Sequence, residues 1–550
     1  MGIRAKIISS LEKVFIDDQI DKFNSLSHIS AFKNERISFQ LAVFKDDHTR
    51  YAQSFRIKTD FKYSKNVSIR LVKSVPVSFA AFPAFTDGYL RTSPGLYPDL
   101  LLPLFSSDTV SVFYGQITCA FIQIDGELEC GVYPFTVELI SGDTVMASCK
   151  LDIEIINCCL PKQKTCFTQW FHYDCLANYY NVEPFTDRYF EILKNFVTTA
   201  VRNGINTILT PVVTPPLDTA INKERRTTQL VTVYRNDGEY SFDLTLFDRF
   251  VRLCLDCGIE HFEICHLFTQ WGARACPKVM AYENGEYKRI FGWDTDSCSE
   301  EYRKFLRCML TELKKRMAEL SVLEGAIFHI SDEPPSEMAE KYSDAKNGIK
   351  DILCDVRVYD ALSDINFYKS GIIDNPIPSL DHAMNFIQAN VKDLWVYYCS
   401  GQYDKVSNRF IAMPSSRTRI LGIQMYKYNI KGFLHWGYNF YSTNGSLASV
   451  NPYVTTDGNN WVPAGDTFSV YPASDGTAYE SLRLCVFYDA LQDIRALELA
   501  EEYIGREAVL SIIDSMADTP ITFKEYPLSQ DYIITLREKI NNAVKEKLNG

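Results

Sequence analysis

The chain has 550 residues, of which 46% are hydrophobic and 23% charged, an ordinary globular composition with room for more than one hydrophobic core. Its formal net charge of -12, with no dense run of lysine or arginine, argues against nucleic acid as a partner. No stretch approaches the roughly 18 apolar residues of a membrane span. Near the N-terminus, Glu12 and Lys13 interrupt any apolar signal core. We therefore expect a cytoplasmic protein that does not enter a membrane.

From the start to about residue 160, apolar residues recur at every second position, as in half-buried strands. The clearest alternations cover residues 37–43, 67–71, 135–139 and 151–155. The pattern predicts an antiparallel β-sandwich over residues 1–160. This region has no tryptophan and no convincing cluster of titratable residues, so we interpret it as a supporting domain.

Between residues 161 and 505, predicted strands alternate with predicted helices. The helices are expected at residues 187–202, 244–257, 302–317, 416–428 and 481–500. The strands are expected at residues 167–173, 205–209, 259–265, 323–330, 356–362, 394–399, 432–436 and 467–471. Eight strands, each followed by helical sequence, predict a (β/α)8 TIM-type barrel. Residues 506–550 contain further helical sequence, which we interpret as a C-terminal appendage.

Sixteen cysteines in a chain without an export signal indicate reduced thiols, many of them buried. Cys254 and Cys257 form a Cys-x-x-Cys pair, with Cys265 and His266 further along, so zinc binding is an alternative. However, the pair continues the apolar face of a predicted helix, and the second half of a zinc motif is missing. We therefore expect core cysteines, no metal and no cofactor.

The most informative stretch is the end of the fourth expected strand, where Asp332 and Glu333 precede two prolines. Proline cannot donate to a strand ladder, so the strand stops at Glu333 at the latest and leaves both carboxylates at its C-terminal tip. In a (β/α)8 barrel this edge carries the chemistry. The alternative is that Asp332 caps the next helix and Glu333 is a solvated acid in its first turn.

Adjacent residues of a strand point to opposite faces, so Asp332 and Glu333 make a poor couple of nucleophile and acid. They fit a different division of labour in a glycosidase. Glu333 would act as general acid and then base at the glycosidic oxygen, while Asp332 holds a 2-acetamido group of the substrate. The acetamido oxygen would attack the anomeric carbon. A tyrosine hydroxyl would hold that oxygen, with Tyr397, Tyr398 and Tyr438 as the candidates.

Two long connections, residues 266–296 and 438–466, follow predicted strands and so lie on the C-terminal face, where loops of this length are usually functional. Both are aromatic, and all six tryptophans fall in the predicted barrel. Indole rings stack on apolar sugar faces, although some, Trp395 above all, fit a core role instead. The substrate-binding candidates are Trp170, Gln270, Trp271, His329, Tyr397, Tyr398, Arg409, Trp436, Tyr438 and Asn439.

Arg409 and His329 each allow two interpretations. The guanidinium of Arg409 could bind a sugar hydroxyl or an anionic substituent, or it could form a salt bridge to a barrel carboxylate. His329 could bond a sugar hydroxyl or orient the acid pair, or it could be a satisfied core histidine.

Several stretches resemble the motifs of glycoside hydrolase family 123 and of the related domain of unknown function 4091. They are residues 204–206, 209–211, 214–218, 266–272, 329–334, 407–410 and 432–439. The resemblance spans essentially the whole chain and implies an N-terminal β-sandwich and a C-terminal barrel. It also implies β-N-acetylgalactosaminidase activity by the substrate-assisted route, with Asp332 and Glu333 as the catalytic pair.

We therefore expect an exo-acting, retaining β-N-acetylhexosaminidase for terminal N-acetylgalactosamine, with carbohydrate as its partner. The alternatives are a glycosidase for another β-linked sugar with the same acid, or a carbohydrate-binding protein on an inactive barrel. Two close carboxylates that repel each other argue against the inactive barrel. The sequence leaves open the natural glycan, the aglycone and whether copies of the chain form a homo-oligomer.

Overall fold

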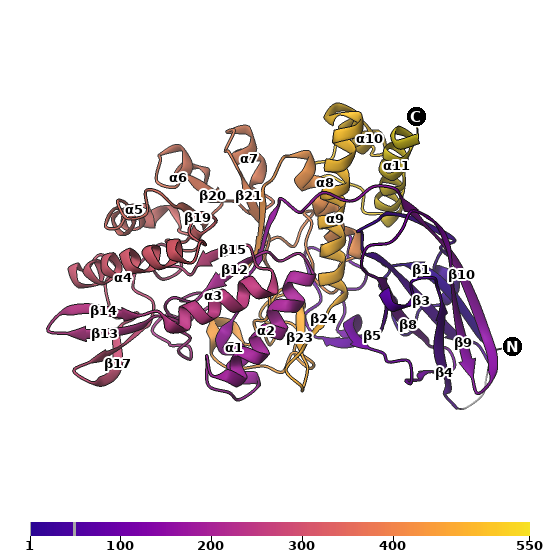
Figure 1. The fold of residues 1–550 in the computed structure, drawn as a ribbon, viewed down its shortest axis with the longest axis horizontal. Helices are drawn as coiled ribbons and strands as arrows, with labels where there is room; N and C mark the ends of the chain where they lie inside the picture. Colours follow the sequence, from indigo (N-terminus) through magenta and orange to yellow (C-terminus); the bar gives the residue numbers. More distant parts are fainter. Residues whose placement is uncertain (1, 48–50, 550) are drawn as a thin grey trace.

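The computed structural model describes residues 2–47 and 51–549, and its N-terminal region consists of two five-stranded sheets (Figure 1). The first contains, in spatial order, β1 (Ile3–Ser9), β3 (Ile37–Lys45), β8 (Ile117–Ile124), β5 (Val67–Val77) and β6 (Gly95–Pro103). The second contains β2 (His28–Phe32), β10 (Thr144–Ile156), β9 (Gly131–Ser141), β4 (Gln53–Asp60) and β7 (Val110–Val112). Alternating apolar residues from both sheets form one core, in which the rings of Phe39 and Phe135 meet edge to face at 5.1 Å.

The pairing in these sheets differs from the predicted antiparallel pattern at one edge. Strand β2 runs parallel to β10, whereas the other strand pairs of the two sheets are antiparallel. The two strands are far apart in the chain, and only strands joined by a short hairpin are forced to be antiparallel.

Eight parallel strands form the barrel. In chain order they are β11 (Cys166–Gln169), β12 (Thr207–Thr210), β15 (His261–Ile264), β18 (Ile327–Phe328), β19 (Arg357–Ala361), β20 (Asn375–Ile377), β21 (Trp395–Tyr397) and β22 (Gly432–His435). Ladders join all neighbours except β20 and β21. There the backbone N–H of Leu380 donates to Tyr397 O at 3.0 Å and a bridge joins Ser379 to Tyr397, so the ring is nearly closed.

One predicted strand lies outside the barrel and another was missed. The stretch predicted as the eighth strand, 467–471, contributes instead to β23 (Val470–Pro472), which pairs with β24 (Ala478–Glu480) in a separate antiparallel hairpin. The missed strand, β20, has three residues and contains Pro376, so it shows no periodic pattern. The acid pair still follows the fourth strand, as predicted, but Arg409 follows the seventh strand rather than the sixth.

Helices surround the barrel, and the five longest of them correspond to the helices that the sequence predicts. They are α1 (Tyr173–Tyr179), α2 (Asp187–Arg202), α3 (Thr245–Cys257), α4 (Glu300–Glu319), α5 (Ala339–Asn347), α6 (Ile365–Lys369), α7 (Ala383–Gln388), α8 (Ser415–Lys427) and α9 (Leu482–Ile504). Single 3-10 turns cover Ile20–Lys22, Ser64–Asn66, Ser336–Met338 and Asn444–Ser446. Helix α3 ends at Gly258, whose φ of 102° is left-handed. Ser299 is the N-cap of helix α4, and its hydroxyl oxygen accepts the N–H of Tyr302.

A separate four-stranded sheet extends from the barrel, at the lower left of Figure 1. Its order is β14 (Glu239–Asp243), β13 (Thr232–Asn236), β16 (Val279–Glu283) and β17 (Glu286–Phe291). One hairpin is inserted between β12 and α3, and the other lies in the predicted long connection between β15 and α4. Both insertions follow a barrel strand, so they belong to the C-terminal side of the barrel.

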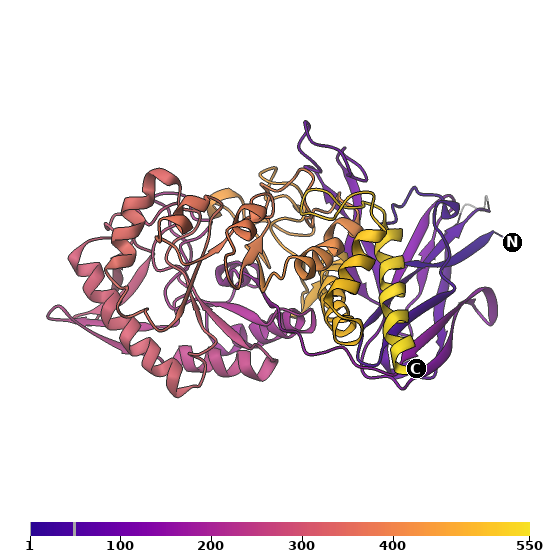
Figure 2. The same ribbon diagram turned by 90° about the horizontal axis from the view of Figure 1, so that it is seen from above.

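The C-terminal helices, which the sequence left unplaced, join the two halves of the chain. Helix α10 (Arg506–Ser515) packs on α9, and α11 (Gln530–Asn549) lies beside the N-terminal sheets in Figure 2. In their shared core, Ile533 and Ile540 of α11 meet Phe32 of β2 and Ile423 of α8. The division of the chain at residues 160 and 505 stays a prediction. In the described part of the chain, no helix is long and apolar enough to cross a membrane.

Candidate active site

The segment that carries the acid pair is held between two neighbouring loops of the barrel. Strand β18 ends at Phe328, earlier than predicted, because the next carbonyls bond to the loop after β15 rather than to a ladder. Leu267 N donates to His329 O at 3.1 Å, and Trp271 N donates to Asp332 O at 2.7 Å. On the other side, Glu333 N donates to Ala361 O at 2.9 Å. These bonds fix the backbone on both sides of the carboxylates.

The two carboxylates differ in exposure and backbone conformation. Asp332 is half-buried, whereas Glu333 is exposed and has a φ of 40°. A positive φ is uncommon for a residue with a side chain and is found where the surroundings enforce it, often at functional sites. The Tyr397 hydroxyl donates a hydrogen bond to Glu333 Oε1. The capping alternative fails, because Pro335 occupies the N-cap of the next turn and no side chain caps it.

Electrostatics favour retention of a proton at this pair. Burial raises the pKa of Asp332 well above its usual range, and the charges of Glu333, Asp218 and Asp360 add to the rise. Two carboxyl groups this close resist a second negative charge. Burial and the neighbouring carboxylates therefore favour the neutral form of Asp332 in the free protein.

His329 lies under the pair in a buried, charged network. Its Nε2–H donates to Glu263 Oε1 at 2.7 Å and its Nδ1–H donates to the Tyr359 carbonyl. Burial lowers the pKa of His329, but bonds to Asp360 and Glu263 outweigh this effect and raise it to about 10. His329 is therefore an imidazolium, and its positive charge opposes the rise in the pKa of Asp332.

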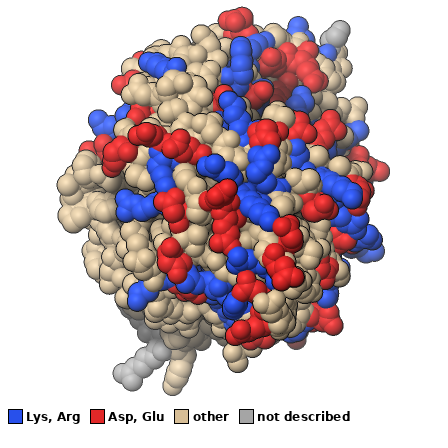
Figure 3. All heavy atoms as spheres, turned by 90° about the vertical axis from the view of Figure 1, so that its left-hand side faces the viewer, with Lys and Arg blue, Asp and Glu red and all other residues tan. Residues whose placement is uncertain are grey.

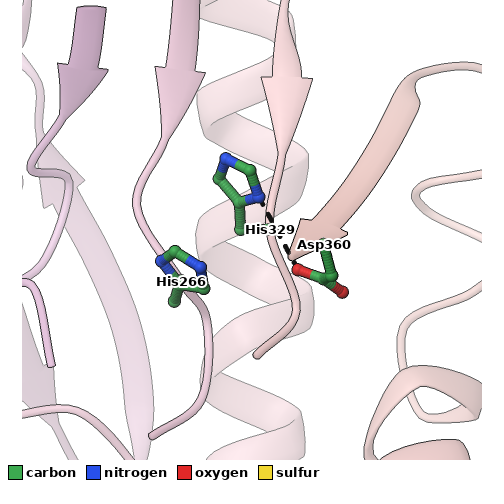
Figure 4. A group of neighbouring side chains, drawn as sticks. All are labelled: His266, His329 and Asp360. Carbon is green, nitrogen blue, oxygen red and sulfur yellow. Dashed lines mark ion pairs between the residues drawn. The ribbon is translucent and has the colours of Figure 1, made fainter. Parts of the chain in front are cut away.

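His266 and His329 stack with centroids 4.5 Å apart and, with Asp360, form a group spaced closely enough to bind a metal ion (Figure 4). The residues do not fit that role. Both nitrogens of His329 donate hydrogen bonds, and Asp360 accepts them from Ile330 N and the Tyr342 hydroxyl. A metal would have to displace these bonds, so we assign no step to one. Of the cysteines considered for zinc, Cys254 and Cys265 are buried, whereas Cys257 is partly exposed.

Of the predicted substrate-binding residues, Tyr397 and Trp271 bond directly to the acid pair. Trp271 is 50% exposed and, like Glu333, has a positive φ, of 61°. Gln270 is buried and holds the next loop: its Oε1 accepts Asp218 N at 2.6 Å. Trp170 and Trp436 lie deeper and donate their indole N–H groups to Glu263 and Asp466.

Four other predicted binding residues are buried and bonded within the scaffold. The buried Tyr438 donates to Phe196 O, and Asn439 bonds the backbone of His172. Tyr398 is buried against the rings of Phe433 and His435. The buried guanidinium of Arg409 donates to Gln169, His435 and two carbonyls, and in the described part of the chain it forms no ion pair, contrary to the salt-bridge alternative. Trp395 is a core residue, as its alternative assignment predicted.

The sequence did not single out Asp218, although it ends the motif at residues 214–218. Burial raises the pKa of Asp218 to about 7, with Arg225 opposing the rise and Asp466 and Glu333 adding to it. Its φ is 51°, and its carbonyl accepts the Ser446 hydroxyl at 2.7 Å. A third carboxyl group therefore stands beside the pair.

The family model described as the glycoside hydrolase 123 catalytic domain matches residues 170–500. In fold, the chain is similar to a family 123 glycoside hydrolase from Clostridium perfringens, with a TM-score of 0.74 and 16% identity over 100% of this chain and 98% of the other. A family 39 glycoside hydrolase from Bacteroides cellulosilyticus is less similar, with a TM-score of 0.32 and 10% identity over 81% and 80%. No curated protein sequence matches the chain. The matched residues contain the acid pair and seven of the eight barrel strands, all but β11. The chain therefore belongs to glycoside hydrolase family 123.

Proposed function

We propose that this glycoside hydrolase is an exo-acting, retaining β-N-acetylgalactosaminidase that uses the substrate's 2-acetamido group as its nucleophile. The observation that carries the proposal is the adjacency of Asp332 and Glu333 on a segment bonded on both sides, with the Tyr397 hydroxyl on Glu333. A conventional retaining pair needs carboxyls about 5 to 5.5 Å apart on opposite sides of the sugar, usually from different strands. Two consecutive residues are better suited to acting on one side of the sugar ring.

In the first step, Glu333 donates its proton to the glycosidic oxygen while the acetamido oxygen attacks the anomeric carbon. The bond to the leaving group breaks, and an oxazolinium ring forms. Asp332 accepts the acetamido N–H and stabilises the positive charge on the ring. Glu333 then removes a proton from water, which attacks the same carbon and restores the sugar with its configuration retained.

Three further residues fit supporting roles. Tyr397 is the only one of the three candidate tyrosines whose hydroxyl bonds an acid of the pair, so we assign it to the acetamido oxygen and to the orientation of Glu333. Trp271 offers an exposed indole for stacking on a sugar face. Asp218 offers a carboxyl group for a ring hydroxyl. The cytoplasmic location and the supporting role of the N-terminal region stay predictions.

The test is release of p-nitrophenol from matched β-glycosides with and without the 2-acetamido group. We expect cleavage of the N-acetylgalactosaminide only. Glu333→Gln should lose on the order of 10² to 10⁴ in rate on substrates with poor leaving groups and much less on p-nitrophenyl substrates. Asp332→Asn should slow cleavage for every leaving group.

Equal cleavage of a glycoside that lacks the acetamido group would refute the substrate-assisted route. Full activity of both variants, with circular dichroism unchanged, would refute the site itself.

A further inference from the structure

Three tyrosines stand side by side across the sheet that extends from the barrel, and we refer to Tyr234, Tyr282 and Tyr287 as the tyrosine row. Tyr282 of β16 pairs directly with Tyr234 of β13 on one side and with Tyr287 of β17 on the other. Directly paired residues share one face of a sheet. The ring centroids are 5.6 and 4.9 Å apart, and the side chains are 37, 39 and 50% exposed in chain order.

The opposite face of the sheet is fully used in packing. Tyr240, Phe242 and Phe291 surround Phe305 of α4, with ring centroids between 5.2 and 6.1 Å from it. Arg235, one residue after Tyr234, pairs with Glu283 at 3.1 Å on that side. Because residues alternate between faces, the sheet is anchored to α4 and presents the row to solvent.

The charged side chains that share the row's face are already paired. Arg289 bonds Asp294, Lys304 bonds Glu239, and Asp243 accepts the N–H and the hydroxyl of Thr245. Figure 3 faces this end of the molecule and shows basic and acidic side chains intermingled rather than segregated. The face therefore offers aromatic rings and hydroxyls without a field of one sign, which suits a neutral ligand that is both apolar and hydroxylated.

The row lies on the side of the barrel that carries the acid pair. The two hairpins of its sheet are inserted after the barrel strands β12 and β15, and loops that follow barrel strands belong to the C-terminal side. The connection after β15 also contains Trp271, whose backbone N–H donates to Asp332 O at 2.7 Å. The sheet that carries the row and the loop that holds the acid pair therefore belong to the same connection.

We propose that the tyrosine row binds neutral sugar rings of the leaving part of the glycan, beyond the terminal sugar at Asp332 and Glu333; this rests on the proposed function. A second copy of the chain is the competing occupant. The surface that three partly exposed tyrosines offer is far smaller than the roughly 800 Å² that each partner buries in a stable protein interface. This small area favours a sugar chain as the occupant.

The experiment measures binding and turnover for wild type, Tyr282→Ala and the doubly substituted Tyr234→Ala/Tyr287→Ala. The matched control is Tyr51→Ala, since Tyr51 is 82% exposed and lies in the N-terminal region. The probes are a neutral tetrasaccharide ending in β-linked N-acetylgalactosamine and the p-nitrophenyl glycoside of the same sugar. Affinity is measured by calorimetry in the Glu333→Gln background, where the tetrasaccharide survives, and kcat/KM is measured with the active enzyme.

We expect the row variants to bind the tetrasaccharide about tenfold more weakly and to lose a similar factor in kcat/KM on it. Their kcat/KM on the p-nitrophenyl glycoside, and both values for Tyr51→Ala, should stay at wild-type levels. Equal tetrasaccharide affinity in wild type and row variants would overturn the inference, as would a wild-type dimer that the variants dissociate. If the short glycoside is not cleaved, the proposed function fails, and the calorimetric comparison still decides the row.

Discussion

At the residue scale, Glu333 depends on its backbone as much as on its carboxylate. Its φ of 40° turns the chain immediately after Asp332, and the bond from its N–H to Ala361 O holds that turn. Such a conformation costs on the order of 1 to 3 kcal/mol and persists only where neighbouring bonds enforce it. Here the cost allows two consecutive side chains to serve one site.

Asp218 should control the acid limit of activity. When ionised, it raises the pKa of Asp332, so Asp218→Asn should let Asp332 ionise at lower pH. Because the proposed role of Asp332 requires its carboxylate, we expect the acid limb of kcat/KM to move down in pH. The exposed Glu286→Gln serves as control, and an unchanged or upward-shifted limb would contradict the prediction.

Asp218→Asn should also change how the stability of the protein depends on pH. The pKa of Asp218 in the folded protein is about 7, above its ordinary value of 3.8, so its contribution to stability is complete in acid and lost as pH rises through 7. Asp218→Asn should therefore raise Tm relative to wild type more at pH 8 than at pH 5. Scanning calorimetry at both pH values tests this, and an equal difference at both would exclude the assigned shift.

The sequence singled out Asp332 and Glu333 as the candidate pair because an apolar run that ends in two acids and two prolines is visible along the chain. It did not separate Tyr397 from Tyr398 or Tyr438. Neighbours such as Tyr397 and Tyr398 point to opposite sides of a strand end, and which side faces the site depends on the tilt of the barrel. Asp218 was missed because it lies in an irregular loop without periodicity.

At the scale of elements, the long helices α2, α3, α4, α8 and α9 were predicted because each covers several turns, whereas the short α1, α5, α6 and α7 were not. The prediction for 187–202 coincides with α2 (Asp187–Arg202). The barrel strands were harder, because β18 and β20 have two and three residues and too few alternations to count. The prediction therefore counted residues 467–471 as the eighth strand and omitted β20.

The β21–β22 contact should be intolerant of any added side chain. Gly432 lies directly opposite Trp395, and a Cβ at Gly432 would overlap the indole ring. We expect Gly432→Ala to reduce the free energy of unfolding by about 1 to 3 kcal/mol, the usual cost of overpacking a core. Gly95→Ala is the matched control, since its Cβ would be 3.7 Å from the nearest atom, on Tyr97. Urea denaturation should separate the two, and equal midpoints would show that the barrel absorbs the methyl group.

At the scale of the whole molecule, α11 links the sheets to the barrel. Arg537 bonds Glu35 at 2.6 Å, and Ile540 is buried in the core shared by β2, α8 and α9. We expect Ile540→Asp to lower Tm by several degrees or more in a single calorimetric transition, because a buried charge weakens both halves together. Asn542→Asp on the exposed side of α11 is the control. A second transition that keeps the wild-type Tm would show that the halves unfold independently.

The position of α11 also sets an order for biosynthesis. The ribosome releases α11 after the sheets and the barrel, yet its apolar face covers Phe32 and Ile156, which precede the barrel in the chain. The nascent N-terminal sheets therefore leave the ribosome with one apolar flank uncovered and wait for several hundred residues of barrel before it is sealed. A nonsense mutation that removes α11 would leave that flank exposed to chaperones and proteases, even though Asp332 and Glu333 had already been made.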